Sequence, residues 1–64
     1  MYIKEGDILI THSYFRKYKE GTRFKIIEMR PSYSKIVLQE IDSGKLEIVW
    51  TKVIDLDSRF KKEC

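Results

Sequence analysis

Several residue types are scarce in this chain of 64 residues, and each scarcity excludes a class of protein. The only cysteine is Cys64, so no internal disulfide can form, and the framework that stabilises many small secreted domains is excluded. Residues 1–7 lack the apolar core of a secretion signal. No stretch approaches the roughly 20 apolar residues that a membrane-spanning helix needs. By elimination, we expect a cytoplasmic protein.

The residues that carry chemistry are equally few. His12 is the only histidine, and its neighbour Ser13 would point to the opposite face of an extended strand, so no nucleophile–base pair is indicated. One histidine and one cysteine supply no closed set of metal ligands, and the 3 glycines are too far apart for a phosphate-binding loop. Two carboxylate pairs are better explained by turns, capping and solvation: Glu40 with Asp42, and Asp55 with Asp57. We therefore predict a protein that is not an enzyme and that has no metal site and no cofactor.

The residues that are abundant favour a single β domain over residues 1–64. Alanine and asparagine are absent, whereas Ile, Val, Thr and the aromatic residues supply 23 of the 64 positions. These types fit a pleated, half-buried surface. Sixteen Ile, Leu and Val residues with a net charge of +3 argue against disorder. A core of this size contributes about 3–5 kcal/mol of net stability, which leaves little structure for a deep active site.

Apolar alternation and turn residues predict the strands. We expect them over residues 8–11, 22–30, 33–41 and 45–50, with a short lead-in strand over residues 1–3. The second of these strands changes its apolar phase between Ile26 and Ile27. That change indicates a β-bulge, or a strand that is covered on both faces.

A hairpin joins the last two of these strands. Asp42-Ser43-Gly44 predicts a tight three-residue turn with Gly44 in the left-handed conformation. After the turn, Leu46, Ile48 and Trp50 alternate with other residues, so we expect them to face the core and Trp50 to be buried.

Two segments allow alternative interpretations. Residues 12–20 fit a long loop that contains a helical turn, which we favour, or a short helix capped by Ser13 and ended by Gly21. Residues 51–56 fit a helical turn before a last strand. Residues 57–63 fit a short helix with Asp57 as its N-cap and Phe60 packing inward.

This order of strands and turns resembles the Src-homology-3-like small barrel. Four features carry the resemblance: Gly6-Asp7 before 8–10, Gly21 before 24–27, the hairpin at 42–44, and residues 51–56. The resemblance implies a mostly β, five-stranded barrel with a long basic first loop and, as an option, a short C-terminal helix. Peptide-binding members of this superfold usually have an acidic first loop and a tryptophan pair. This chain has a basic loop and one tryptophan, so the resemblance does not imply binding of proline-rich peptides.

The excess of positive charge is local. Residues 12–25 hold five cations against Glu20 alone, a net of +4, while the rest of the chain holds 8 cations and 9 anions. Aromatic rings are interleaved with these cations, and such a surface suits single-stranded nucleic acid, because cations meet phosphates and rings stack on bases. The candidate binding residues are Tyr14, Arg16, Lys17, Tyr18, Lys19, Arg23 and Lys25, extended by Arg30, Tyr33 and Lys35.

The sequence thus predicts a small binding module that contacts nucleic acid or a nucleoprotein machine through this basic-aromatic loop. Three alternatives remain. The aromatic residues cap one end of the barrel while the cations keep it soluble. The chain regulates or inhibits a larger complex of a host or a phage, since Tyr, Phe and Arg are also enriched at protein interfaces. The chain forms a weak homodimer through an open sheet edge.

Overall fold

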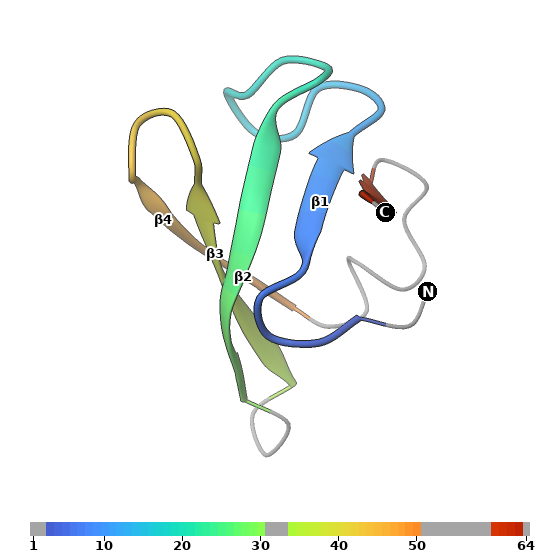
Figure 1. The fold of residues 1–64 in the computed structure, drawn as a ribbon. Coiled ribbons are helices and arrows are strands. Elements are labelled where there is room, and N and C mark those ends of the chain that lie inside the picture. The colour runs from blue at the N-terminus through green and yellow to red at the C-terminus, as the bar shows by residue number, and fades with distance from the viewer. Residues whose placement is uncertain (1–2, 31–33, 51–59, 64) are drawn as a thin grey trace.

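A computed structural model describes residues 3–30, 34–50 and 60–63, and in these ranges the chain forms one antiparallel sheet without any helix (Figure 1). The strands are β1 (Ile8–Thr11), β2 (Arg23–Arg30), β3 (Lys35–Glu40), β4 (Leu46–Trp50) and β5 (Phe60–Lys62). Their order across the sheet is β4-β3-β2-β1-β5. The prediction of a mostly β fold is therefore confirmed in these ranges. The alternative prediction of a helix over residues 57–63 is wrong for residues 60–62, which form β5 and pair with β1. Residues 51–59, which include the predicted helical turn at 51–56, lie outside the described part.

The core lies on the inner face of this twisted sheet, and every strand contributes to it. Figure 1 shows β3 and β4 crossing behind β2, so that the two ends of the sheet turn toward each other. The buried cluster consists of Leu9, Phe15, Phe24, Ile26, Ile36, Leu38, Val49 and Phe60. Phe60 packs inward as expected, although from a strand. Among the described residues β4 pairs only with β3 and β5 only with β1, so the sheet has an edge strand at each end.

The change of phase in β2 is a β-bulge, as predicted. Ile26 pairs with Leu38 and Glu28 with Val37, so Ile27 is an extra residue with no partner of its own on β3. The extra residue lets Ile26 face the core on one side of the bulge and Met29 pack against the core on the other. Ile27 is left 41% exposed.

The prediction that Trp50 is buried is wrong. Leu46, Ile48 and Trp50 are 60%, 50% and 55% exposed, and the residue of β4 that enters the core is Val49. The cause is the hairpin register. Glu40 N–H donates to the carbonyl oxygen of Lys45 at 2.8 Å, so four residues (41–44), rather than three, lie between the strands. A shift of one residue turns every side chain of a strand to the other face.

The helix predicted as an alternative for residues 12–20 is also absent. Phe15 and Tyr18 exchange backbone hydrogen bonds at 2.9 and 2.8 Å, which closes a two-residue turn. Arg16, the first residue inside this turn, has φ +54°, outside the helical region. The favoured loop is thus present, but its helical turn is replaced by a left-handed residue.

Gly44 has φ +76° and donates its N–H to the carbonyl oxygen of Glu40 at 2.8 Å, which confirms the left-handed turn residue. We expect Gly44→Val to lower the free energy of unfolding by about 1–2 kcal/mol, because a β-branched residue is strained at this φ. A Cβ here would meet only Gln39 Nε2, at an ordinary 3.8 Å, so the cost comes from the backbone alone. Urea denaturation measures it, with Gly44→Asn as the control that tolerates φ > 0. Equal midpoints for wild type and Gly44→Val would contradict this turn.

Candidate functional site

The basic loop, residues 12–22, is anchored at its base by Thr11. The Thr11 side chain is 2% exposed; its hydroxyl donates to the carbonyl oxygen of Lys19 at 3.0 Å and accepts the N–H of Thr22 at 3.0 Å. Gly21 N–H in turn donates to the carbonyl oxygen of Thr11 at 2.9 Å. These bonds fix both ends of the loop on the last residue of β1.

Two of the three aromatic residues in this loop belong to the core. Phe15 is 3% exposed. The Tyr18 ring packs edge-on against Phe24, with 5.0 Å between centroids, and its hydroxyl donates to Glu47 Oε2 at 2.7 Å. Tyr14, by contrast, is 70% exposed. Phe15 is thus part of the core and the half-buried Tyr18 packs against it, while Tyr14 is the most exposed ring of the loop.

The three arginines among the candidate binding residues are all paired with carboxylates. Arg23 makes two bonds of 3.0 Å with Glu63, and Arg30 lies 2.8 Å from Glu28. Arg16 forms an ion pair with Glu47 and also donates to the carbonyl oxygen of Ile48 at 2.8 Å. Such pairs reduce the charge that these arginines offer to a phosphate.

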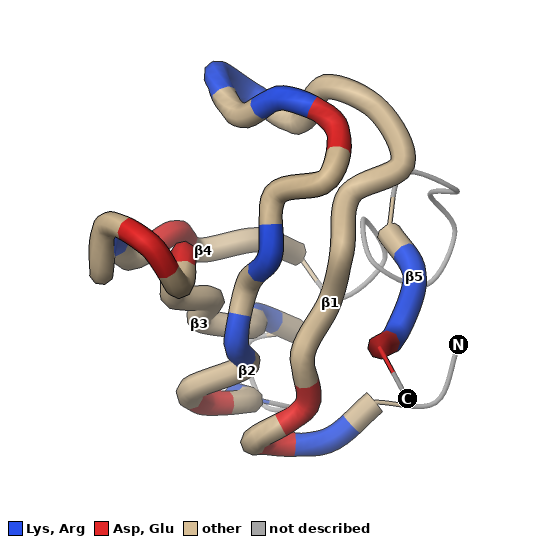
Figure 2. The backbone as a smooth tube through the Cα atoms, turned by 45° about the horizontal axis from the view of Figure 1, so that its top comes forward, with Lys and Arg blue, Asp and Glu red and all other residues tan. Residues whose placement is uncertain are grey.

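The lysines among the candidates are less engaged. Within the described residues no carboxylate lies at ion-pair distance from Lys17, Lys19, Lys25 or Lys35. Tyr33 lies outside the described residues. Figure 2 shows positive positions of the loop followed by a negative one, and acidic positions recur at the turn after β3.

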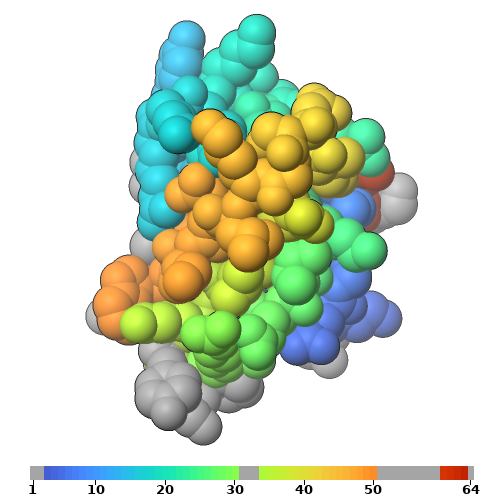
Figure 3. Space-filling model, turned by 90° about the vertical axis from the view of Figure 1, so that its left-hand side faces the viewer, coloured from blue at the N-terminus to red at the C-terminus, as the bar shows by residue number. Residues whose placement is uncertain are grey.

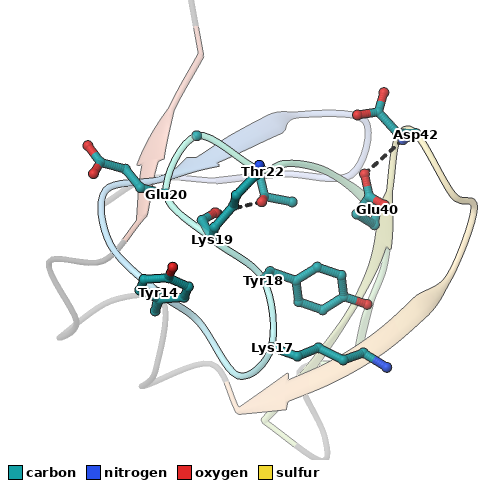
Figure 4. A pocket seen from close by; sticks show the side chains of 9 residues that line it. Tyr14, Lys17, Tyr18, Lys19, Glu20, Thr22, Glu40 and Asp42 are labelled. Atoms are coloured by element: carbon teal, nitrogen blue, oxygen red, sulfur yellow. Dashed lines mark hydrogen bonds between the residues drawn. The ribbon is translucent and has the colours of Figure 1, made fainter.

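A hollow of about 540 Å³ lies between this loop and the β3–β4 turn (Figure 4). Its lining residues are Tyr14, Lys17, Tyr18, Lys19, Glu20, Gly21, Thr22, Glu40 and Asp42. Figure 4 shows the side chains of Lys17 and Tyr18 extending to one side of the loop, whereas Glu20 points the other way. The lining holds two lysines and three carboxylates, a formal net charge of −1. The lining thus offers no net positive charge to a polyanion.

The carboxylate of Glu40 stabilises the turn beside this hollow. Glu40 is 8% exposed and accepts the backbone N–H groups of Asp42 and Ser43 at 2.8 and 3.1 Å. Hydrogen bonds from the side chain of Ser43 and from these N–H groups lower the pKa of Glu40. Glu40 is therefore a structural group of the hairpin.

Glu47 is the second structural carboxylate. The Tyr18 hydroxyl, and then Arg16, lower the pKa of Glu47, while the same hydrogen bond raises the pKa of Tyr18 to about 12. A carboxyl group with a lowered folded pKa stabilises the protein above its unfolded pKa, and this contribution is lost as the pH falls through the folded value. The cluster is partly exposed, with 46% of the Arg16 side chain and 17% of the Glu47 side chain in solvent, so its contribution is modest.

We expect Glu47→Gln to be less stable than wild type by about 1 kcal/mol at pH 7 and nearly equal to it at pH 3. Urea midpoints at the two pH values test this. Asp7 and Glu40, whose pKa values are also lowered, are present in both proteins and cancel in the comparison. An equally large difference at both pH values would show that the ionised form of Glu47 is not the source.

A second surface, which the sequence interpretation missed, lies on the outer face of β2, β3 and β4. We call it the outer face; it is shown in Figure 3, where β4 is orange. The register aligns three rows of residues across it: Lys25, Gln39 and Leu46; Glu28, Val37 and Ile48; and Arg30, Lys35 and Trp50. Directly opposite residues of neighbouring strands share a face. The apolar members on β4 are therefore contiguous and bordered by cations.

The lysine in the last row contacts the aromatic ring. Lys35 Nζ lies 5.1 Å from the centroid of Trp50, a cation–π distance. Val37, opposite Ile48, is 6% exposed and forms the floor of the apolar area. One sequence signal for this surface existed, the alternation in 46–50. The consecutive apolar residues of β3 left the register of the hairpin undetermined, so the alternation was assigned to the wrong face.

No protein-family model matches the chain, and neither a curated protein nor a solved structure is significantly similar to it. In the described ranges no three His, Cys, Asp or Glu side chains gather where they could hold a metal ion. The same ranges contain no helix with the length and apolar character needed to cross a membrane.

Proposed function

We propose that this chain is a non-enzymatic protein-interaction module that binds a larger protein through its outer face. The observation that carries the proposal is the exposure of Leu46, Ile48 and Trp50, each at least 50% exposed, side by side on one strand. Full burial of one such side chain is worth about 1.5–3 kcal/mol, so covering the half that remains exposed yields about 1 kcal/mol each. Contiguous exposed apolar areas with a polar border mark interaction sites.

The arrangement of strands also supports the proposal that the fold is a Src-homology-3-like barrel. The first four strands form a meander, and the fifth returns to pair beside the first. This order, together with the long first loop, agrees with a Src-homology-3-like barrel. That superfold serves many binding functions, so the fold alone selects none. In this proposal the chain regulates or inhibits a larger host or phage complex. The contacts between the two centre on Trp50, because tryptophan is enriched at interface hot spots.

Nucleic-acid binding is the second candidate, and one observation favours it. Lys17 and Lys19 have no ion-pair partner among the described residues, and Tyr14 beside them is 70% exposed. The ion pairs of Arg16, Arg23 and Arg30 and the acidic side of the hollow argue against it.

Capture from a nuclease-treated lysate of the source cells tests the protein-interaction proposal. Immobilised wild type is expected to retain a partner, and Ile48→Asp is expected to lose it. His12→Asp is the matched control, because His12 is an exposed loop residue away from the outer face and the charge change is the same. Retention of the partner by Ile48→Asp, or its loss by His12→Asp, would contradict the proposal.

Fluorescence anisotropy with labelled single- and double-stranded oligonucleotides tests the second candidate. If it is correct, wild type binds at low salt, and the double variant Lys17→Gln/Lys19→Gln binds with a log–log salt slope smaller by about 1.4, at roughly 0.7 per phosphate contact on a single strand. The ring of Tyr14 then contributes by stacking, and Tyr14→Ala weakens binding without changing the slope. No binding by the wild type in ~50 mM salt at tens of micromolar protein would end this candidate.

A further inference from the structure

β4 exposes a main-chain edge as well as side chains. In an antiparallel pair, the N–H and C=O of one residue point to the same side, and the side alternates from residue to residue. The carbonyl oxygen of Lys45 accepts a bond from Glu40 on the β3 side, whereas the carbonyl oxygen of Ile48 accepts one from Arg16 on the other side. The main-chain groups of Leu46, Ile48 and Trp50 therefore point away from β3, along an edge with which no described strand pairs.

The same three residues thus offer two kinds of contact at once. Their side chains lie on the outer face, and their N–H and C=O groups line the edge of the sheet. Within the described part of the chain, Arg16 Nη2 is the one group that bonds this edge, and it covers only the carbonyl oxygen of Ile48. An unpaired edge of this kind is a template for another strand.

The charges along this edge are mostly positive. Arg16 contacts it directly, Lys17 is close enough to lower the pKa of Glu47, and Lys35 lies over Trp50 at the far end. The anion among them, Glu47, is already bonded to Arg16 and Tyr18. Among the described residues, these three cations and the engaged carboxylate carry a net charge of +2, which complements an acidic segment.

A second copy of this chain fits the edge poorly. In an antiparallel pairing of two β4 strands centred on Ile48, the Arg16 side chains of both copies would meet at the two-fold axis, because each is bonded to its own Ile48. Like charges at that position oppose the dimer. The edge therefore favours a heterologous partner of opposite charge.

We propose that the partner contributes an extended, acidic segment that adds as a strand to the edge of β4, with apolar side chains at alternate positions over the outer face. This inference rests on the proposed protein-interaction function and specifies its geometry. An incoming backbone N–H replaces Arg16 Nη2 on the carbonyl oxygen of Ile48. Arg16 stays with Glu47 and pairs with an acidic side chain of the added strand. Main-chain bonds of this kind supply affinity, and the alternating side chains supply specificity.

A phage-displayed library of random nonapeptides, selected against the immobilised full chain, provides the probe. The enriched peptides are expected to alternate apolar and other residues and to carry Asp or Glu. Methylation of single backbone nitrogens in the best peptide should weaken binding about tenfold at every second position and leave the positions between them unchanged. Enrichment of helical spacing or of basic peptides, equal effects at all positions, or no enrichment would overturn the inference.

A pair of variants at one position tests the edge from the side of the protein. Ile48→Ala removes side-chain contact only, whereas Ile48→Pro also removes the edge N–H and leaves the β3 ladder intact, since proline is tolerated where the N–H faces solvent. Ile48→Pro should bind the selected peptide about tenfold more weakly than Ile48→Ala. Equal binding by the two variants would overturn strand addition while the outer-face proposal stands. If Ile48→Pro fails to fold, the methylated peptides decide the question alone.

Analytical ultracentrifugation of the wild type supplies the remaining control. A monomer at the concentrations used for selection agrees with a heterologous partner. A dimer that Ile48→Pro abolishes would identify the occupant of the edge as a second copy and overturn the inference. The lysate capture described above depends on the apolar side chains rather than on the edge, so failure of the two proposals can be told apart.

Discussion

Phe24→Ala is expected to unfold the domain at 25 °C. Phe24 is fully buried and lies at the centre of an aromatic cluster, with ring centroids 6.0 Å from Phe15, 5.0 Å from Tyr18 and 6.4 Å from Phe60. Truncating a buried Phe costs about 3–5 kcal/mol, because contacts are lost and a cavity remains. That cost equals the net stability of about 3–5 kcal/mol expected for a core this small.

Trp50→Ala is the matched control, because it removes a larger ring from the outer face. Trp50 is 55% exposed, so we expect a loss of about 1 kcal/mol or less and a folded protein. Proton–nitrogen correlation spectra separate the two results by the dispersion of their amide signals. A well-dispersed spectrum for Phe24→Ala, or a collapsed one for Trp50→Ala, would contradict the placement of these rings. Wild-type tryptophan fluorescence should be readily quenched.

The second large effect is expected at Thr11. In Thr11→Val the shape is kept and the hydroxyl is lost, so the carbonyl oxygen of Lys19 and the N–H of Thr22 lose their part-buried partner. The Thr22 hydroxyl still donates to the carbonyl oxygen of Lys19 at 2.6 Å, so the expected cost is that of the two lost hydrogen bonds, about 0.5–1.5 kcal/mol each. The loss should also free the base of the basic loop, so amide hydrogen exchange at Thr22 should rise more than exchange at the core strands.

Thr11→Ser keeps the hydroxyl and serves as the control for Thr11→Val. We expect it to restore the protection of Thr22 and most of the stability. Guanidinium denaturation and hydrogen exchange on the three proteins provide the measurement. If the serine and valine variants lose equal stability, the methyl group rather than the hydroxyl anchors the loop.

The register of the β3–β4 hairpin is the part of the fold that could not be predicted from the sequence. Turn residues and alternation located four of the strands and the bulge at Ile27, because these signals are local. The face of β4 depends on whether the hairpin loop holds three residues or four, and residues 41–45 fit both. The apolar run Ile36-Val37-Leu38 on β3 accepts either register, so nothing in the sequence opposed the wrong one.

The candidate site was limited in a similar way. The composition of residues 12–25 correctly indicates local positive charge, but charge that is counted along the chain ignores partners that are distant in sequence. Arg16 meets Glu47 and Arg23 meets Glu63, at separations of 31 and 40 residues. Only the folded chain shows that these cations are engaged and that the exposed apolar residues lie elsewhere.

The bond from Arg16 to the carbonyl oxygen of Ile48 has a consequence for the isolated protein. An apolar edge strand without a partner can also start a fibril, because β4 of another copy of the chain can pair with it. A charged side chain laid across that edge opposes this growth, and its left-handed backbone holds it in place. Arg16 is the described group that bonds this edge, so we expect Arg16→Ala to aggregate more readily than wild type.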